Sequence, residues 1–222
     1  MSNRTQYDEA LRSIGEALRG MGEAAADADR RAFALLAQPD AAAAQEIIEG
    51  DKRIDEREKE IEHACLALLL RQQPVAADLR FVSAALKLVT DLERIGDHAA
   101  DLAEISLVLE PGWQQRIPAQ AALHSMADTA LGMVRSAVAA FADRDLALSR
   151  AVIARDDEVD AQFDRIKRTL ADYIACHPGE IDAALDLLMV TKYLERLGDH
   201  AVNIAEWVGF LQTGCYRGER IV

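Results

Sequence analysis

One 14-residue phrase occurs twice in this chain of 222 residues. Residues Asp91–Glu104 read DLERIGDHAADLAE, and residues Tyr193–Glu206, 102 positions later, read YLERLGDHAVNIAE. In both copies the apolar residues recur every three or four positions, which is the period of an amphipathic helix. A chain of this length accommodates two units of about 110 residues each. The repeat therefore predicts two similar helical units in tandem.

All five prolines fall at points where the helical periodicity stops. Proline lacks a backbone donor and clashes with the preceding turn, so it marks helix boundaries. The expected helices span residues 7–38, 41–73, 76–109 and about 119–142, then a stretch that ends before Pro178 and a stretch that fades near Gly214. Long helices joined by short loops pack as antiparallel bundles. The sequence therefore predicts an all-α fold in which six long antiparallel helices form two tandem three-helix bundles.

A second pair of matching segments supports the repeat. GDKRIDER at Gly50–Arg57 corresponds to RDDEVDAQ at Arg155–Gln162. The aspartates that correspond are Asp51 with Asp156 and Asp55 with Asp160. This offset of 105 residues exceeds that of the first repeat by three, which a difference in loop length explains. The expected domains are residues 1–112 and 113–222, divided within the linker at residues 110–118.

The charge and the composition restrict the partners of the protein. The chain carries 38 acidic and 25 basic residues, a net charge of −13 that repels nucleic-acid backbones. It has no polybasic run for an anionic bilayer, and its longest aliphatic run, residues 64–70, is too short to span one. Three separated cysteines without a CxxC motif indicate reduced thiols, and the first residues form no apolar signal core. We expect a soluble cytoplasmic protein that binds neither nucleic acid nor membrane.

The repeated phrase places acidic residues four positions apart, on one face of a helix. Stability alone would favour glutamate followed by lysine at that spacing, because stacked acids repel each other. Convergent oxygen ligands instead suit a hard cation such as Mg²⁺, Mn²⁺ or iron. Each copy of the phrase combines with the aspartate pair of the preceding helix to give a candidate cluster. The candidate metal ligands are Asp51, Asp55, Glu93, Asp97, Asp101, Asp156, Asp160, Glu195, Asp199 and Asn203.

Other residues of the phrase have expected roles outside metal ligation. Gly96 and Gly198 cost about 1 kcal/mol each within a helix, and a small residue there permits close approach of a neighbouring helix or of a metal with its waters. His98 and His200 lie about 100° away from the acidic stripe, so we expect them to pack or to form hydrogen bonds. Glu58 extends the stripe of the first half, but the matching residue is Phe163, so it stays outside the expected site.

The residues now described resemble the PhoU family of bacterial phosphate-signalling accessory proteins. The segments that carry the resemblance are RQQPVAADLRFVSAALKLVTDLERIGDHAADLAE at Arg71–Glu104 and MVTKYLERLGDHAVNIAEW at Met189–Trp207. The resemblance implies two three-helix bundles whose acidic motifs hold metal clusters in some members, with Fe, Zn, Mn or Mg as the candidate ions. One implied site contains Asp51, Asp55, Glu93, Asp97 and Asp101, and the other contains Asp156, Asp160, Glu195, Asp199 and Asn203. In the family, asparagine is more typical at the position of Asp101.

The resemblance also implies a function and partners. A PhoU-like adaptor modulates the ATPase of the Pst phosphate importer, a PstB-type protein, and represses the phosphate-starvation response through a PhoR-type sensor histidine kinase. Homodimers occur among such proteins.

Three hypotheses follow for the acidic motifs. The leading one is a metal-binding regulatory adaptor that is not an enzyme. The second is a carboxylate-bridged metalloenzyme. Against it stand the lack of an ExxH pair in both copies of the repeated phrase and the absence from the sequence of an HExxH motif, a nucleophile elbow and a Gly-rich phosphate loop. The third is a structural scaffold whose acids form solvated salt bridges with arginines such as Arg94 and Arg196.

Overall fold

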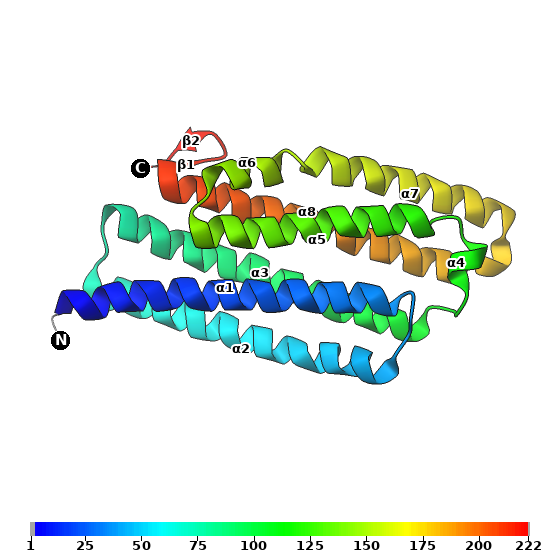
Figure 1. Ribbon diagram of the computed structural model, residues 1–222, viewed down its shortest axis with the longest axis horizontal. Coiled ribbons are helices and arrows are strands. Elements are labelled where there is room, and N and C mark those ends of the chain that lie inside the picture. Colours follow the sequence, from blue (N-terminus) through cyan, green and yellow to red (C-terminus); the bar gives the residue numbers. More distant parts are fainter. Residues whose placement is uncertain (1–2, 222) are drawn as a thin grey trace.

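The computed structural model of the protein describes residues 3–221, and almost all of them lie in helices (Figure 1). The helices are α1 (Asn3–Leu35), α2 (Ala41–Gln72), α3 (Ala76–Val108), α4 (Trp113–Arg116), α5 (Gln120–Asp143), α6 (Leu146–Ile153), α7 (Asp156–Cys176), the 3₁₀ helix η1 (Pro178–Glu180) and α8 (Ile181–Thr213). A short hairpin of β1 (Cys215–Tyr216) and β2 (Glu219–Arg220) follows α8.

These helices confirm the fold class that the sequence predicts. Helices α1, α2 and α3 pack together as one antiparallel bundle, and α5, α6, α7 and α8 form the other. The two bundles meet where α3 packs on α8 and α1 packs on α5, and the paired helices run side by side along the molecule (Figure 1). The repeated phrase therefore lies on the two helices at the centre of the structure, α3 and α8.

The core forms along the apolar face that the repeat predicts. On α3 this face is fully buried, and it consists of Leu88, Leu92, Ile95, Ala99 and Leu102. Burying a leucine or isoleucine side chain stabilises a fold by about 1.5–3 kcal/mol relative to leaving it exposed. The packing of α3 and α8 therefore fixes the side of each helix that remains for the acidic residues.

Capping residues determine several of the helix ends. The Asp40 carboxylate accepts hydrogen bonds from the backbone N–H groups of Ala42 and Ala43 at the start of α2, at 2.9 and 3.1 Å. Asp145 caps α6 in the same way. Such caps stabilise a helix by about 1 kcal/mol. At the other end of the chain, α8 stops at Gly214, whose φ of 74° is accessible to glycine without strain.

The structure differs from the expectation in the second bundle, where the fifth helix is two helices. The chain turns at Ala154 and Arg155, between α6 and α7. Three consecutive acids, Asp156, Asp157 and Glu158, occupy the first turn of α7, where the helix dipole favours negative charge. This sequence therefore starts a new helix at the point where the first bundle continues one.

The linker between the bundles has structure of its own. It contains α4, and Trp113 on this helix is buried, with its indole N–H donating a hydrogen bond to the Leu36 carbonyl at 2.8 Å. Trp113 therefore anchors the linker to the end of α1.

The terminal hairpin is a feature that the sequence reasoning missed. Its turn residues Arg217 and Gly218 both have positive φ, which suits a two-residue hairpin turn. Tyr216 stacks on Trp207 of α8, with ring centroids 4.2 Å apart, so the hairpin folds back against the last turns of α8.

Candidate metal centre

Three carboxylates of the first bundle converge. Asp51 and Asp55 lie one turn apart on α2, and Asp97 faces them from α3. One oxygen atom from each of the three lies within 4.8 Å of the others. All three side chains are half-buried, so the packing of α2 on α3 holds them close together although their charges repel. The structure thus brings together three of the residues that the sequence predicts as ligands.

Two buried carboxylate oxygens, one of the trio and one of a neighbouring glutamate, lack a hydrogen-bond partner among the described residues. They are Asp51 Oδ1 and Glu93 Oε2. Burial and, after it, the neighbouring charge of Asp97 raise the pKa of Asp51 to about 6. Burial and Asp97 likewise raise the pKa of Glu93, against the opposing effect of Arg94, to about 7. A cation between these oxygens would replace the missing partners and compensate the repulsion.

The donor set fits the metal that the sequence suggests. It consists of carboxylate oxygens alone, which are the ligands of hard cations such as Mg²⁺, Mn²⁺ and iron. Asp101 lies further along the same face of α3, and its charge also reaches Asp51. Glu58, which we did not expect in the site, raises the pKa of Glu93 and therefore belongs to its electrostatic surroundings.

Gly96 makes this arrangement possible. A Cβ atom at Gly96 would lie 2.8 Å from Ile54 Cδ1 and 3.3 Å from Asp51 Oδ1. The close approach of a neighbouring helix that the sequence predicts is therefore confirmed. At Gly198 a Cβ would meet only Val159, at an ordinary distance of 3.4 Å.

The corresponding carboxylates of the second bundle lie near one another but converge less. Burial raises the pKa of Asp156, and the charges of Asp160 and Asp199 raise it further. Burial and Glu195 raise the pKa of Asp199, whereas Lys192 lowers it. Across residues 3–221, the Asp51, Asp55 and Asp97 trio is the one group of ligand atoms that meets within 4.8 Å.

The remaining predicted ligand of the second bundle, Asn203, lies at the seam between α3 and α8. Its side-chain amide donates a hydrogen bond to Asp91 Oδ1 at 3.1 Å, and its carbonyl oxygen accepts one from Arg217 at 3.2 Å. The repeat-related Asp101 also reaches the seam, where it adds to the effect of burial in raising the pKa of Tyr193.

The two histidines of the repeated phrase lie at the same seam, as expected for packing and hydrogen bonding. His200 donates from Nδ1 to Asp91 Oδ1 at 2.8 Å. His98 is buried, with its ring centroid 5.3 Å from that of Tyr193 and 5.6 Å from that of His200. Because Tyr193 is the repeat counterpart of Asp91, each histidine faces the same position of the opposite helix.

Two residues at these sites were given no role by the sequence reasoning. They are Asp91, which binds His200 and Asn203, and Lys192, which binds Glu195. Their signal in the sequence is a mismatch between the two copies at the first position of the repeated phrase and at the residue before it. Asp91 stands where the second copy has Tyr193, and Lys192 stands where the first copy has Thr90.

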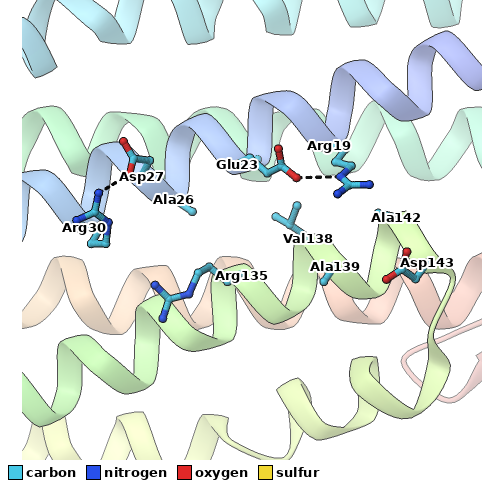
Figure 2. A pocket seen from close by; sticks show the side chains of 11 residues that line it. Arg19, Glu23, Ala26, Asp27, Arg30, Arg135, Val138, Ala139, Ala142 and Asp143 are labelled. Atoms are coloured by element: carbon cyan, nitrogen blue, oxygen red, sulfur yellow. Dashed lines mark hydrogen bonds and ion pairs between the residues drawn. The ribbon is translucent and has the colours of Figure 1, made fainter.

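A separate groove of about 370 Å³ lies between α1 and α5 (Figure 2). Its rim carries Arg19 paired with Glu23 and Arg30 paired with Asp27, while Arg135 extends from α5. None of the candidate metal ligands lines this groove.

None of the helices described here is long and apolar enough to span a bilayer.

Comparison with known proteins relates the whole chain to one family. The PhoU domain matches it twice, at residues 18–106 and 123–208. The phosphate-specific transport system accessory protein PhoU homolog of Caulobacter vibrioides is 38% identical over 185 residues, which cover 82% of this chain and 79% of that protein. The homolog of Xylella fastidiosa is 35% identical over 209 residues, covering 94% of this chain and 87% of that protein.

Solved structures agree with these matches. The crystal structure of PhoU from Pseudomonas aeruginosa superposes with a TM-score of 0.89 at 32% identity, covering 94% of this chain and 100% of that chain. The phosphate transport system regulatory protein PhoU from Streptococcus pneumoniae gives a TM-score of 0.83 at 27% identity, covering 95% and 98%.

Proposed function

Because the chain belongs to the PhoU family, we propose that it is an accessory regulator of a phosphate transport system. In this role it acts in the cytoplasm as an adaptor, modulating a PstB-type transporter ATPase and repressing the phosphate-starvation response through a PhoR-type sensor kinase. The observation that carries the proposal is the similarity to PhoU accessory proteins along almost the full chain, with both copies of the domain present.

The physical character of the molecule supports an adaptor. The net charge of −13 on a helical bundle provides anionic surfaces that attract basic patches on partner proteins. A deletion strain assayed for alkaline phosphatase at high phosphate tests the regulatory role. We expect constitutive expression that the wild-type gene reverses. Normal repression in the deletion strain would overturn the proposal.

We further propose that the two carboxylate clusters bind divalent or ferric cations. The convergence of Asp51, Asp55 and Asp97 within 4.8 Å and the buried Glu93 oxygen that accepts no hydrogen bond support this for the first cluster. The repeat supports it for the second, where Asp156, Asp160, Glu195, Asp199 and Asn203 hold the corresponding positions.

Metal analysis separates this proposal from a structural scaffold. Protein reconstituted with Mn²⁺, Fe²⁺ or Zn²⁺ should retain metal, and the double variant Glu93→Ala with Asp97→Ala should lose the metal of the first cluster while its helix content stays unchanged. Protein that retains no metal after reconstitution would exclude the metal sites and leave the adaptor role to the genetic test.

Homodimerisation is part of the proposal and has its own measurement. Light scattering coupled to size-exclusion chromatography should give twice the chain mass of 24.3 kDa.

A further inference from the structure

We propose that the two carboxylate clusters are unequal: the first is the high-affinity cation site, and in the second Lys192 neutralises part of the acidic charge and so lowers the affinity for a cation. This inference rests on the cation binding proposed above. It adds a residue, Lys192, that sets the affinity and the stoichiometry of binding in this chain.

The contacts of Lys192 place its ammonium group at the second cluster. Its Nζ forms a short ion pair with Glu195 Oε2. It also lies 5.5 Å from the centroid of the Phe163 ring, a cation–π distance. Only 16% of the Glu195 side chain is exposed, and Lys192 provides this mostly buried carboxylate with a positive partner. The charge of Lys192 also reaches Asp199, whose pKa it lowers.

The first cluster lacks both features that hold this lysine. The repeat places Thr90 opposite Lys192 and Glu58 opposite Phe163. The ammonium group is thus replaced by a hydroxyl, and the ring that supports it is replaced by another carboxylate. Glu58 raises the pKa of Glu93, and burial with Glu62 and Asp55 raises the pKa of Glu58 itself. These two differences give the first cluster one positive charge fewer and one negative charge more than the second.

A second internal cation lies at the other end of the second acidic stripe. Arg217 of the terminal hairpin forms an ion pair with Glu206 at 2.7 Å and donates to Asn203 Oδ1 at 3.2 Å. Because Asn203 also donates to Asp91, both polar atoms of its side chain are engaged. Within the described residues, the other carboxylates of the second cluster, Asp156, Asp160 and Asp199, form no ion pair.

Arg94 is the nearest cation to the first cluster, and it does not fill it. Its guanidinium lies 2.7 Å from Asp97 Oδ2 and 3.4 Å from Glu93 Oε2, and its side chain is 52% exposed, against 44% for Lys192. With Arg94 in place, Glu93 Oε2 still has no hydrogen-bond partner among the described residues. Asp51 Oδ1, on the α2 side, has no partner at all within the described residues.

The inference is tested by exchanging the residues at positions 192 and 90, which the repeat relates to each other. Full-length protein stripped of metal by a chelator is titrated with Mn²⁺, and free Mn²⁺ is counted by electron paramagnetic resonance. The variants are Asp51→Asn, Asp156→Asn, Lys192→Thr and Thr90→Lys. Lys167→Thr is the matched control, because Lys167 also lies over the Phe163 ring, at 5.0 Å, but pairs with Asp164 outside the cluster.

We expect one tight class of site per chain, which Asp51→Asn weakens by at least about tenfold and Asp156→Asn leaves unchanged. Lys192→Thr should strengthen the weaker class on the order of tenfold, since like charges a few ångströms apart repel. Thr90→Lys should weaken the tight class, and Lys167→Thr should change neither. Lys192→Gln provides a second neutral variant, and circular dichroism checks that each variant is folded.

Three results would overturn the inference. Two classes of site with equal affinity would show that the clusters are equivalent, and so would a tight class that depends equally on Asp51 and Asp156. Either result would still support the proposed cation binding. A weaker class unaffected by Lys192→Thr and Lys192→Gln would remove the role of Lys192. Wild-type protein that retains no Mn²⁺ would exclude both the inference and the proposed cation binding.

Discussion

His200 on α8 donates a hydrogen bond of 2.8 Å to Asp91 on α3, across the seam between the two bundles. Both side chains are about 85% buried, and Asp91 also accepts from Asn203 at 3.1 Å. Tyr193, the repeat counterpart of Asp91, faces His98 on the other side of the seam. The repeated phrase therefore has two roles on α3 and α8. One face of each helix carries acidic residues of the clusters, and another face forms the contacts that hold the two bundles together.

Replacing Asp91 by alanine should destabilise the protein. The change leaves His200 Nδ1 and the Asn203 amide without their acceptor in a mostly buried position, and an unsatisfied buried polar group costs about 1–3 kcal/mol. The free energy of unfolding in urea measures the effect. The exposed Glu56→Ala is the control, and it should change the stability by less than about 0.5 kcal/mol. An Asp91→Ala variant as stable as this control would show that the seam does not depend on the hydrogen bond.

The two glycines of the repeated phrase should respond in opposite ways to alanine. At Gly96 the new Cβ would lie 2.8 Å from Ile54 Cδ1 and 3.1 Å from its Cγ2, so Gly96→Ala should destabilise the protein by about 1–3 kcal/mol. At Gly198 the nearest atom would be 3.4 Å away, so Gly198→Ala should gain up to about 1 kcal/mol of helix propensity. Thermal unfolding of the two variants checks the difference. Equal shifts in the two would contradict the close approach of α2 to Gly96.

Sequence reasoning predicted the parts of this structure that periodicity and repetition determine. The 3.6-residue pattern gives the helices and the buried face of α3 that includes Leu92 and Ile95, and the repeat gives the tandem bundles. The four-residue spacing placed Asp51 and Asp55 on one face, and Asp97 meets them because α2 packs on α3.

The rest depends on contacts between residues far apart in the sequence. The engagement of Asn203 by Asp91 requires α3 and α8 to pack together, and its contact with Arg217 requires the terminal hairpin to fold back on α8. The residue pattern within a single helix predicts neither of these two contacts. The break at Ala154 follows from local helix-start signals in three consecutive acids, which the repeat alignment concealed.

Cation binding should stabilise the protein more at pH 8 than at pH 5. Burial raises the pKa of Asp51 to about 6 and that of Glu93 to about 7, so at pH 5 both groups hold protons that a cation must displace. We expect Mn²⁺ to raise the melting temperature at pH 8, to raise it little at pH 5, and to have a smaller effect on Asp51→Asn at either pH. Asp164→Asn is the control, since this exposed group pairs with Lys167 outside the cluster. A Mn²⁺ effect that is the same at both pH values would exclude these two carboxylates from the site.

Asp29 on α1 should oppose folding at neutral pH. It is fully buried, and neither of its oxygens has a hydrogen-bond partner among the described residues. Burial raises its pKa well above the usual value of 3.8. A raised folded-state pKa makes a contribution to stability that is fully present below the unfolded pKa and is lost as the pH rises through the folded pKa. The wild-type protein should therefore lose stability as the pH rises from 4, relative to a variant without this carboxyl group.

Asp29→Ala and Asp29→Asn test the two components of this cost. Asp29→Ala removes the titrating group and the unsatisfied oxygens, and it should stabilise the protein at pH 8 by about 1–3 kcal/mol. Asp29→Asn keeps a buried polar group without the charge, so it should abolish the same part of the pH dependence with a smaller gain. Asp27→Ala, an exposed neighbour that pairs with Arg30, should leave the pH dependence unchanged. Urea unfolding across this pH range provides the measurement. A loss of stability in Asp29→Ala at every pH would mean that the carboxyl group has a stabilising partner, such as a buried water molecule.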